Sequence, residues 1–164
     1  MLFHVSEEAG IERFEPRHAV GVEVPVVWAI SEARLHNYLL PRDCPRVTFF
    51  AGRNTTAADR RRLLGDSACV VAVESGWRDR IRSAQLFCYR LPSDTFHCVD
   101  ETAGYFHSAV PVAPVGVDVV PDVLQALTSR GVELRLLPSL FALRDAVVDS
   151  TLSYSIIRMR NARG

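Results

Sequence analysis

The fold class is decided by residues 85–110, which read QLFCYRLPSDTFHCVDETAGYFHSAV. Apolar, aromatic and β-branched residues are concentrated in segments 85–91, 95–99 and 105–110, each of a length typical of a strand. Residues 100–104 end in glycine and separate the last two segments, so these are expected to pair as a hairpin. Consecutive strands without an intervening helix favour an α+β fold over a regularly alternating, doubly wound sheet.

The flanking sequence adds further strands and short helices. Strands are expected at residues 2–5, 24–30, 46–51, 68–73, 132–137 and 152–160. Helices are expected at residues 31–40, 55–64 and 121–130 and after Ser139, with a helical or irregular piece at 77–83 and an extended connector at 111–116. We therefore predict one globular α+β domain over residues 1–164, with a mixed sheet, curled or split, flanked by three or four short helices.

The chain contains no lysine: its 19 basic residues are all arginine and are balanced by 19 acidic residues. Pyridoxal enzymes and Schiff-base aldolases require a lysine amine, and P-loop and protein-kinase sites require a lysine on the phosphates, so these classes are excluded. Arginine cannot act as the missing nucleophile or base because its guanidinium stays protonated. Arginine forks remain available for holding anions.

Composition also bounds the location and the partners. The net charge is zero, so no global field attracts nucleic acid or an anionic membrane. Neither a secretory signal pattern nor an apolar run long enough to span a bilayer is present, and we expect a cytoplasmic protein with neither kind of partner. Its four cysteines lack paired CxxC spacing, which favours structural thiols over a metal site. The sequence does not decide between a monomer and a homodimer.

The first candidate site residues are His4 and Ser6. In an extended chain these two side chains project from the same face of the opening strand. An imidazole beside a hydroxyl can orient a ligand hydroxyl or amide. The structural alternative is a histidine with satisfied hydrogen bonds near the edge of the sheet.

The second candidate group follows the short helix at residues 31–40. Tyr38 precedes a proline-constrained turn that Arg42 and Arg46 bracket. Two guanidinium forks in such a turn can bind a phosphate or a carboxylate. The alternative is a surface charge cluster at the end of the helix. Trp28, in the buried run before this helix, is expected to form part of the core or a cleft wall.

The third candidate group lies on the closing strand. If residues 152–160 are extended, Arg158 and Arg160 share a face about 7 Å apart, a spacing that suits a diphosphate. Glu133 and Arg135 share a face of another strand and could support this clamp or supply a catalytic carboxylate. The alternative is that these arginines form salt bridges with neighbouring acids.

Five motifs together resemble a family of short, functionally uncharacterised bacterial proteins over nearly the whole chain. They are HVSEE at residues 4–8, FEPR at 14–17, VWAI at 27–30, NYLLPRDCPR at 37–46 and SIIRMRN at 155–161. The resemblance implies no activity. It implies that the polar positions in these motifs, Arg17 among them, belong together.

The opening Leu2-Phe3-His4 is also similar to the start of the ADP-ribosyltransferase-like superfamily, which includes RNA 2′-phosphotransferases. That resemblance implies NAD binding. His4 would correspond to the histidine of the superfamily's opening strand, and Tyr38 to an aromatic residue that packs against the nicotinamide. Glu101 and Glu133 compete for the role of the later glutamate. Val5 stands where the superfamily has a glycine.

These observations lead to one functional expectation and one alternative. We expect a small cytosolic enzyme or binding protein with an arginine-lined cleft for an anionic, nucleotide-like ligand such as NAD. His4 and Ser6 would orient its ribose, and a glutamate would act as acid/base or stabilise a cation. The phosphate would be held by Arg42, Arg46, Arg158 and Arg160. The alternative is a non-catalytic accessory protein that dimerises through an exposed apolar face.

Overall fold

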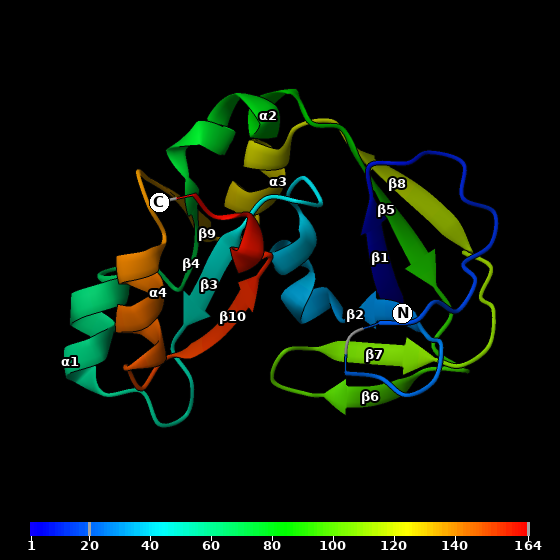
Figure 1. Cartoon of the computed structure of the whole chain (residues 1–164), viewed down its shortest axis with the longest axis horizontal. Coiled ribbons are helices and arrows are strands. Elements are labelled where there is room, and N and C mark those ends of the chain that lie inside the picture. Colours follow the sequence, from blue (N-terminus) through cyan, green and yellow to red (C-terminus); the bar gives the residue numbers. More distant parts are fainter. Residues whose placement is uncertain (20, 164) are drawn as a thin grey trace. The chain divides into compact units, whose positions relative to one another are not determined.

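The structure is a computed structural model that describes residues 1–19 and 21–163. It has the expected α+β fold with a split sheet (Figure 1). The chain forms two compact units, each built from two separate segments. We call Met1–Tyr38 with Gln85–Pro121 the six-stranded unit, and Leu39–Ala84 with Asp122–Gly164 the four-stranded unit.

The six-stranded unit contains an antiparallel sheet of order β6-β7-β2-β1-β5-β8. Its strands are β1 (Leu2–Ser6), β2 (Val27–Ile30), β5 (Leu86–Leu91), β6 (His97–Asp100), β7 (Tyr105–Ser108) and β8 (Gly116–Val120). The short 3-10 helix η1 (Glu32–Tyr38) follows β2. The hairpin expected from residues 95–110 is therefore confirmed as β6 and β7.

One face of this sheet carries the core of the unit. The buried side chains come from β1, β2 and β5 and include Leu2, Val27, Ala29, Tyr89 and Leu91. Phe14, in the loop between β1 and β2, packs into the same cluster, and its backbone pairs with Val112. The Tyr89 hydroxyl fixes this loop, because it donates to the Glu8 carbonyl (2.8 Å) and accepts from the Ile11 amide (3.0 Å).

The four-stranded unit contains a mixed sheet of order β10-β3-β4-β9, in which β4 and β9 are parallel and the other pairs antiparallel. Its strands are β3 (Arg46–Phe50), β4 (Cys69–Glu74), β9 (Val132–Leu137) and β10 (Ser153–Ile157). Its helices are α1 (Ala57–Asp59), α2 (Arg78–Ser83), α3 (Val123–Thr128) and α4 (Phe141–Val148), with the single turns η2 (Arg60–Leu64), η3 (Ser75–Trp77) and η4 (Met159–Asn161).

The core of this unit lies on the face of the sheet that bears Val47 and Phe49 of β3. Buried residues of η2 and α4 and the residue before α4 pack against that face, among them Leu63, Leu64, Val147 and Leu140. Gly65 ends η2 with a φ of 60°, a left-handed conformation that glycine adopts without steric cost. This agrees with the helix end expected there.

Asp59 joins α1 to the start of β10. Its Oδ2 accepts hydrogen bonds from the Thr151 amide (2.9 Å) and hydroxyl (2.7 Å), while the Thr56 hydroxyl caps the helix by accepting from the Asp59 amide (3.2 Å). The hydrogen bonds from Thr151, followed by those from Thr56 and Arg62, lower the pKa of Asp59 from 3.8 to about 2. The carboxylate is therefore favoured in the folded protein.

This shift gives a pH prediction. Because the folded pKa lies below the unfolded one, the contribution of Asp59 to stability is present above pH 3.8 and is lost as the pH falls toward about 2. We expect the free energy of unfolding to fall less steeply in this window for Asp59→Asn than for the wild type. Urea unfolding at several pH values measures this. Equal slopes for the two proteins would contradict the assignment.

Two expectations for individual elements were wrong. The closing strand ends at Ile157, because Arg158 takes a left-handed conformation (φ 59°) and η4 follows it. Arg158 and Arg160 therefore do not stand on one strand face. Sequence analysis also assigned no strand to Gly116–Val120, which forms β8 after the proline-rich connector. No helix in the described part of the chain has the length and hydrophobicity needed to cross a membrane.

Candidate functional site

The six-stranded unit carries a cluster of aromatic rings on the sheet face opposite its core. Trp28 of β2 lies opposite His107 of β7, and Tyr105 lies two residues earlier on β7. Strand alternation places these three side chains on one face, away from Val27 and Ala29. Tyr38 of η1 adds a fourth ring. We call Trp28, Tyr38, Tyr105 and His107 the aromatic cluster.

The rings of the aromatic cluster contact one another in a chain. The Trp28 and Tyr105 centroids are 6.0 Å apart with an interplanar angle of 85°, and Tyr105 and Tyr38 are 6.3 Å apart at 71°. Trp28 and His107 lie 6.0 Å apart at 52°. These are edge-to-face and tilted arrangements, which aromatic pairs prefer. All four residues are half-buried, so parts of the rings reach solvent.

His107 brings a polar atom to these rings. Its Nδ1 is buried, and it has no hydrogen-bonding partner among the residues that the structure describes. Buried polar atoms in proteins are nearly always satisfied by protein or water, and those that are not are often found at functional sites. Planar ring surface beside an unsatisfied nitrogen is a combination suited to a heterocyclic ligand.

His4 and Ser6 occupy the other face of the same sheet. His4 Nδ1 donates to the Trp28 carbonyl oxygen (3.0 Å), and its ring lies 4.6 Å from the Phe14 ring, within the core cluster. Because a carbonyl only accepts, a neutral His4 carries its proton on Nδ1 and has Nε2 as its acceptor nitrogen. The Ser6 hydroxyl accepts from the Glu8 amide (3.1 Å).

The structure thus brings Trp28 and Tyr38 together through Tyr105, but it separates them from the side chains of His4 and Ser6. Arg17 is exposed, and its backbone pairs with that of Val26 in an isolated bridge. Tyr105 and His107 were missed by sequence reasoning. The signal that could have found them is their i,i+2 spacing on a strand already expected at residues 105–110.

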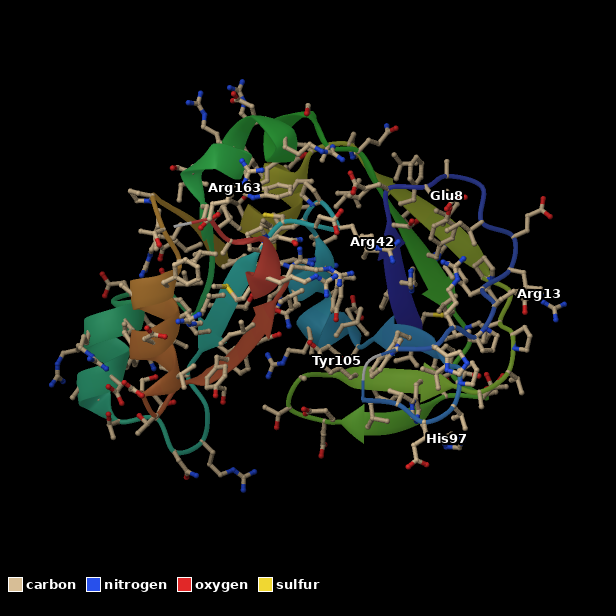
Figure 2. The ribbon with its side chains drawn as sticks, viewed as in Figure 1. Glu8, Arg13, Arg42, His97, Tyr105 and Arg163 are labelled. Atoms are coloured by element: carbon tan, nitrogen blue, oxygen red, sulfur yellow. The ribbon has the colours of Figure 1, made fainter. Side chains whose placement is uncertain are left out.

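In the four-stranded unit, the turn before β3 meets the segment after β10. Arg158 Nε donates to the Arg42 carbonyl (3.3 Å) and lies 4.0 Å from an Asp43 carboxylate oxygen. Asn161 Nδ2 donates to the Asp43 carbonyl (2.8 Å). The motifs NYLLPRDCPR and SIIRMRN are therefore in contact through the backbone carbonyls of Arg42 and Asp43 (Arg42 is labelled in Figure 2). Arg160 is exposed on η4.

Arg46, in contrast, is buried, with 2% of its surface exposed. Its Nη1 donates to the carbonyls of Pro41 (3.1 Å) and Cys44 (2.8 Å) and so holds the turn closed. This contact explains the need for arginine at the start of β3 without any ligand. A role for Arg46 in ligand binding stays a prediction.

Cys44 lies in the same turn and is fully buried. Burial raises the pKa of its thiol to about 12; the Arg46 charge lowers it and the Glu74 charge raises it, both more weakly. The thiol stays protonated at neutral pH and is not a nucleophile. Cys88 is also buried, as expected for structural thiols, whereas Cys98 on β6 is exposed. The described residues include no group of three or more histidine, cysteine or carboxylate side chains placed to hold a metal ion.

Glu133 is held in an ion-pair network on β9. Its carboxylate accepts from Arg135 Nε (3.1 Å) and from the Ser67 hydroxyl, and Arg135 Nη1 donates in turn to the Leu63 carbonyl (3.1 Å). The hydrogen bonds from Arg135 and Ser67 lower the pKa of Glu133. Glu133 is therefore ionised at neutral pH and unsuited to act as a general acid. Its contacts tie η2 to the sheet.

The fold is that of an α+β protein with a split sheet. A model described as a family of unknown function (DUF6886) matches residues 3–162, so the chain belongs to this family. The expected membership of an uncharacterised family covering nearly the whole chain is confirmed. Neither the curated proteins nor the solved structures contain a significant match, and none of the comparisons links the chain to ADP-ribosyltransferases.

Proposed function

We propose that this protein binds a small anionic, nucleotide-like ligand, with the planar ring of the ligand placed against the aromatic cluster. The observation that carries the proposal is the chain of half-buried rings from Tyr38 through Tyr105 to Trp28, with the buried Nδ1 of His107 beside it. Stacking on an aromatic side chain contributes about 1–3 kcal/mol per base. A nitrogen at the edge of the cluster adds a hydrogen-bonding point for a heterocycle or an amide.

A separate anion-binding site is assigned to arginine, the only strong cation that this chain has. Arg42, Arg158 and Arg160 are proposed for it, whereas Arg46 Nη1 holds the turn through the Pro41 and Cys44 carbonyls. These arginines belong to the four-stranded unit and are proposed as an anion site of their own, independent of the aromatic cluster of the six-stranded unit. Recognition of the ring and of the phosphate is therefore tested separately.

The enzymatic form of the proposal is ADP-ribosyl transfer from NAD, as the opening Leu2-Phe3-His4 suggests. In that reaction the bond between ribose C1′ and the nicotinamide nitrogen breaks, nicotinamide leaves, and the ADP-ribosyl group passes to a hydroxyl or to water. A carboxylate would stabilise the developing cation. Of the two glutamates considered, Glu133 is engaged by Arg135 and Ser67, so the proposal takes Glu101, in the turn that leads into Tyr105.

Tryptophan fluorescence can report on the ring directly. The chain has two tryptophans, so Trp77→Phe leaves Trp28 as the single reporter. We expect NAD, ADP-ribose or AMP to quench it, and Trp28→Ala to weaken binding by at least about tenfold in calorimetry, since a stacking contact is lost. Trp77→Ala is the matched control and should bind normally. At the separate arginine site, Arg158→Ala should weaken the binding of inorganic pyrophosphate and leave the ligand quenching of Trp28 unchanged.

The results separate the parts of the proposal. Release of nicotinamide from NAD can be measured by chromatography. If the ligand binds but no nicotinamide is released, the protein is a binding protein and not a transferase. Loss of release in Glu101→Gln with binding retained would support the catalytic assignment. The proposal fails if none of these ligands binds at millimolar concentration, or if Trp28→Ala binds as tightly as the wild type. A non-catalytic accessory protein would then be the better description.

A further inference from the structure

Strand β8 is an exposed and chemically unprotected edge. The six-stranded sheet ends at β8, and no other strand among the described residues pairs with its outer side. Val115, Val117 and Val119 are 60%, 46% and 53% exposed. Native sheets usually protect an edge with charges, proline or a covering element, because an open edge readily pairs with another strand. Within β8 the only charge is Asp118.

We propose that β8 pairs with β8 of a second copy of this chain, antiparallel, around a two-fold axis at Val117. An axis perpendicular to the sheet keeps equivalent faces on the same side, so it must pass through a residue position. With Val117 on the axis, Val117 lies opposite its own copy, and each Val119 lies opposite the other copy's Val115, which precedes β8 and whose amide is bonded to the Arg90 carbonyl of its own chain (2.8 Å). The exposed valines of both chains then form one apolar stripe of cross-strand pairs.

Arg90 and Asp118, on the sheet face opposite that of Val117, favour this register. Around Val117, Gly116 lies opposite the second copy's Asp118. Arg90 of β5 lies over Gly116 so closely that a Cβ there would be 2.4 Å from Nη2. Arg90 Nε is also 3.6 Å from Asp118 of its own chain. Pairing would bring each Arg90 a second carboxylate, giving an alternating network of two arginines and two aspartates.

The neighbouring registers are less favourable. An axis at Asp118 would place the two Asp118 side chains directly opposite each other, which is repulsive. An axis at Val119 would place Pro121 opposite Val117, and proline has no amide proton to donate to the ladder. Of these three axes, the one at Val117 is the one that the side chains of β8 and Arg90 favour. This inference does not depend on the ligand proposal, because a dimer could carry either function.

The size of the contact sets the expected affinity. A stable interface usually buries about 800 Å² on each partner, and one short strand with its valine stripe provides less. We therefore expect a reversible dimer with a dissociation constant on the order of micromolar or weaker. Sedimentation velocity of the full chain over a wide concentration range should show this monomer–dimer equilibrium.

A charge at the axis tests the proposal. Val117→Lys would place two ammonium groups opposite each other, so we expect it to raise the dimer dissociation constant by at least about tenfold. Val99→Lys, an equally exposed valine on the opposite edge strand β6, is the matched control and should leave dimerisation unchanged. Circular dichroism of both variants verifies folding. A monomer at all concentrations, or a dimer that only Val99→Lys disrupts, would overturn the inference.

Cysteine cross-linking tests the register without requiring the dimer to be lost. In a Cys98→Ser background, which removes the exposed native thiol, Val117→Cys should cross-link to itself with a short bis-maleimide. Val119→Cys should not, because two copies of residue 119 lie four residues apart along the strands, or about 13 Å. A mixture of Val119→Cys and Val115→Cys should cross-link. Any other pattern contradicts the Val117 axis.

Discussion

Arg46→Ala is expected to lower the free energy of unfolding by about 3 kcal/mol. The substitution removes a buried guanidinium whose Nη1 bonds the Pro41 and Cys44 carbonyls at 3.1 and 2.8 Å. Both carbonyls would lose a charge-assisted hydrogen bond, and the space left by the side chain would not be filled. Urea unfolding followed by circular dichroism measures the loss.

Two variants separate this structural role from ligand binding. Arg46→Lys keeps the charge but not the planar fork, so a partial loss of stability is expected. Arg42→Ala, at an exposed position of the same turn, should change stability by no more than about 0.5 kcal/mol. If Arg46→Ala were as stable as the wild type but bound ADP-ribose less tightly, the residue would be a ligand contact, and the structural assignment would be wrong.

Phe49→Ala is expected to lower the free energy of unfolding by about 4 kcal/mol. Phe49 of β3 is fully buried, in the same core cluster as Val147 of α4 and Leu140, which precedes that helix. The guanidinium carbon of Arg135 lies 5.7 Å from the centre of its ring, so truncation would also remove a cation–π contact. A cavity between the sheet and α4 is the main cause of the loss.

A matched control for Phe49 exists on α4. Phe141 also has an arginine over its ring, Arg144 at 5.1 Å, but the residue is 37% exposed. Phe141→Ala removes the same atoms without opening a buried cavity, so a change of about 1 kcal/mol or less is expected. Similar losses for the two variants would show that burial in the core of the four-stranded unit does not dominate the effect.

Local patterns in the sequence were sufficient for most strands. The hairpin of β6 and β7 followed from two strand-like segments around a short turn, and β9 was expected at the residues where it occurs. The helix stop at Gly65 likewise followed from a local preference. β8 was not expected, because its strand signal is a single run of five residues between prolines, with an aspartate in its middle.

The candidate site depends on which strands pair in the sheet, and no local sequence pattern predicts that pairing. Trp28 and Tyr38 were identified, but their link is Tyr105, which is brought to them by the pairing of β2 with β7. His4 was expected to share a ligand site with Tyr38, yet strand alternation puts the His4 side chain on the sheet face opposite that of Trp28. The expected common strand face for Arg158 and Arg160 was wrong because the left-handed conformation of Arg158 ends the strand, and local composition did not signal that change.

Periodicity and composition by themselves determined the α+β class, the absence of lysine chemistry and the positions of most strands, because these depend on residues close together in the chain. The roles of individual side chains were decided by strand register, sheet order and burial. They assigned Arg46 to a structural turn, Glu133 to an ion pair and Tyr105 and His107 to the aromatic cluster. The physical reason is that each of these assignments depends on contacts between segments distant in sequence, whose partners are chosen by the packing of the whole sheet.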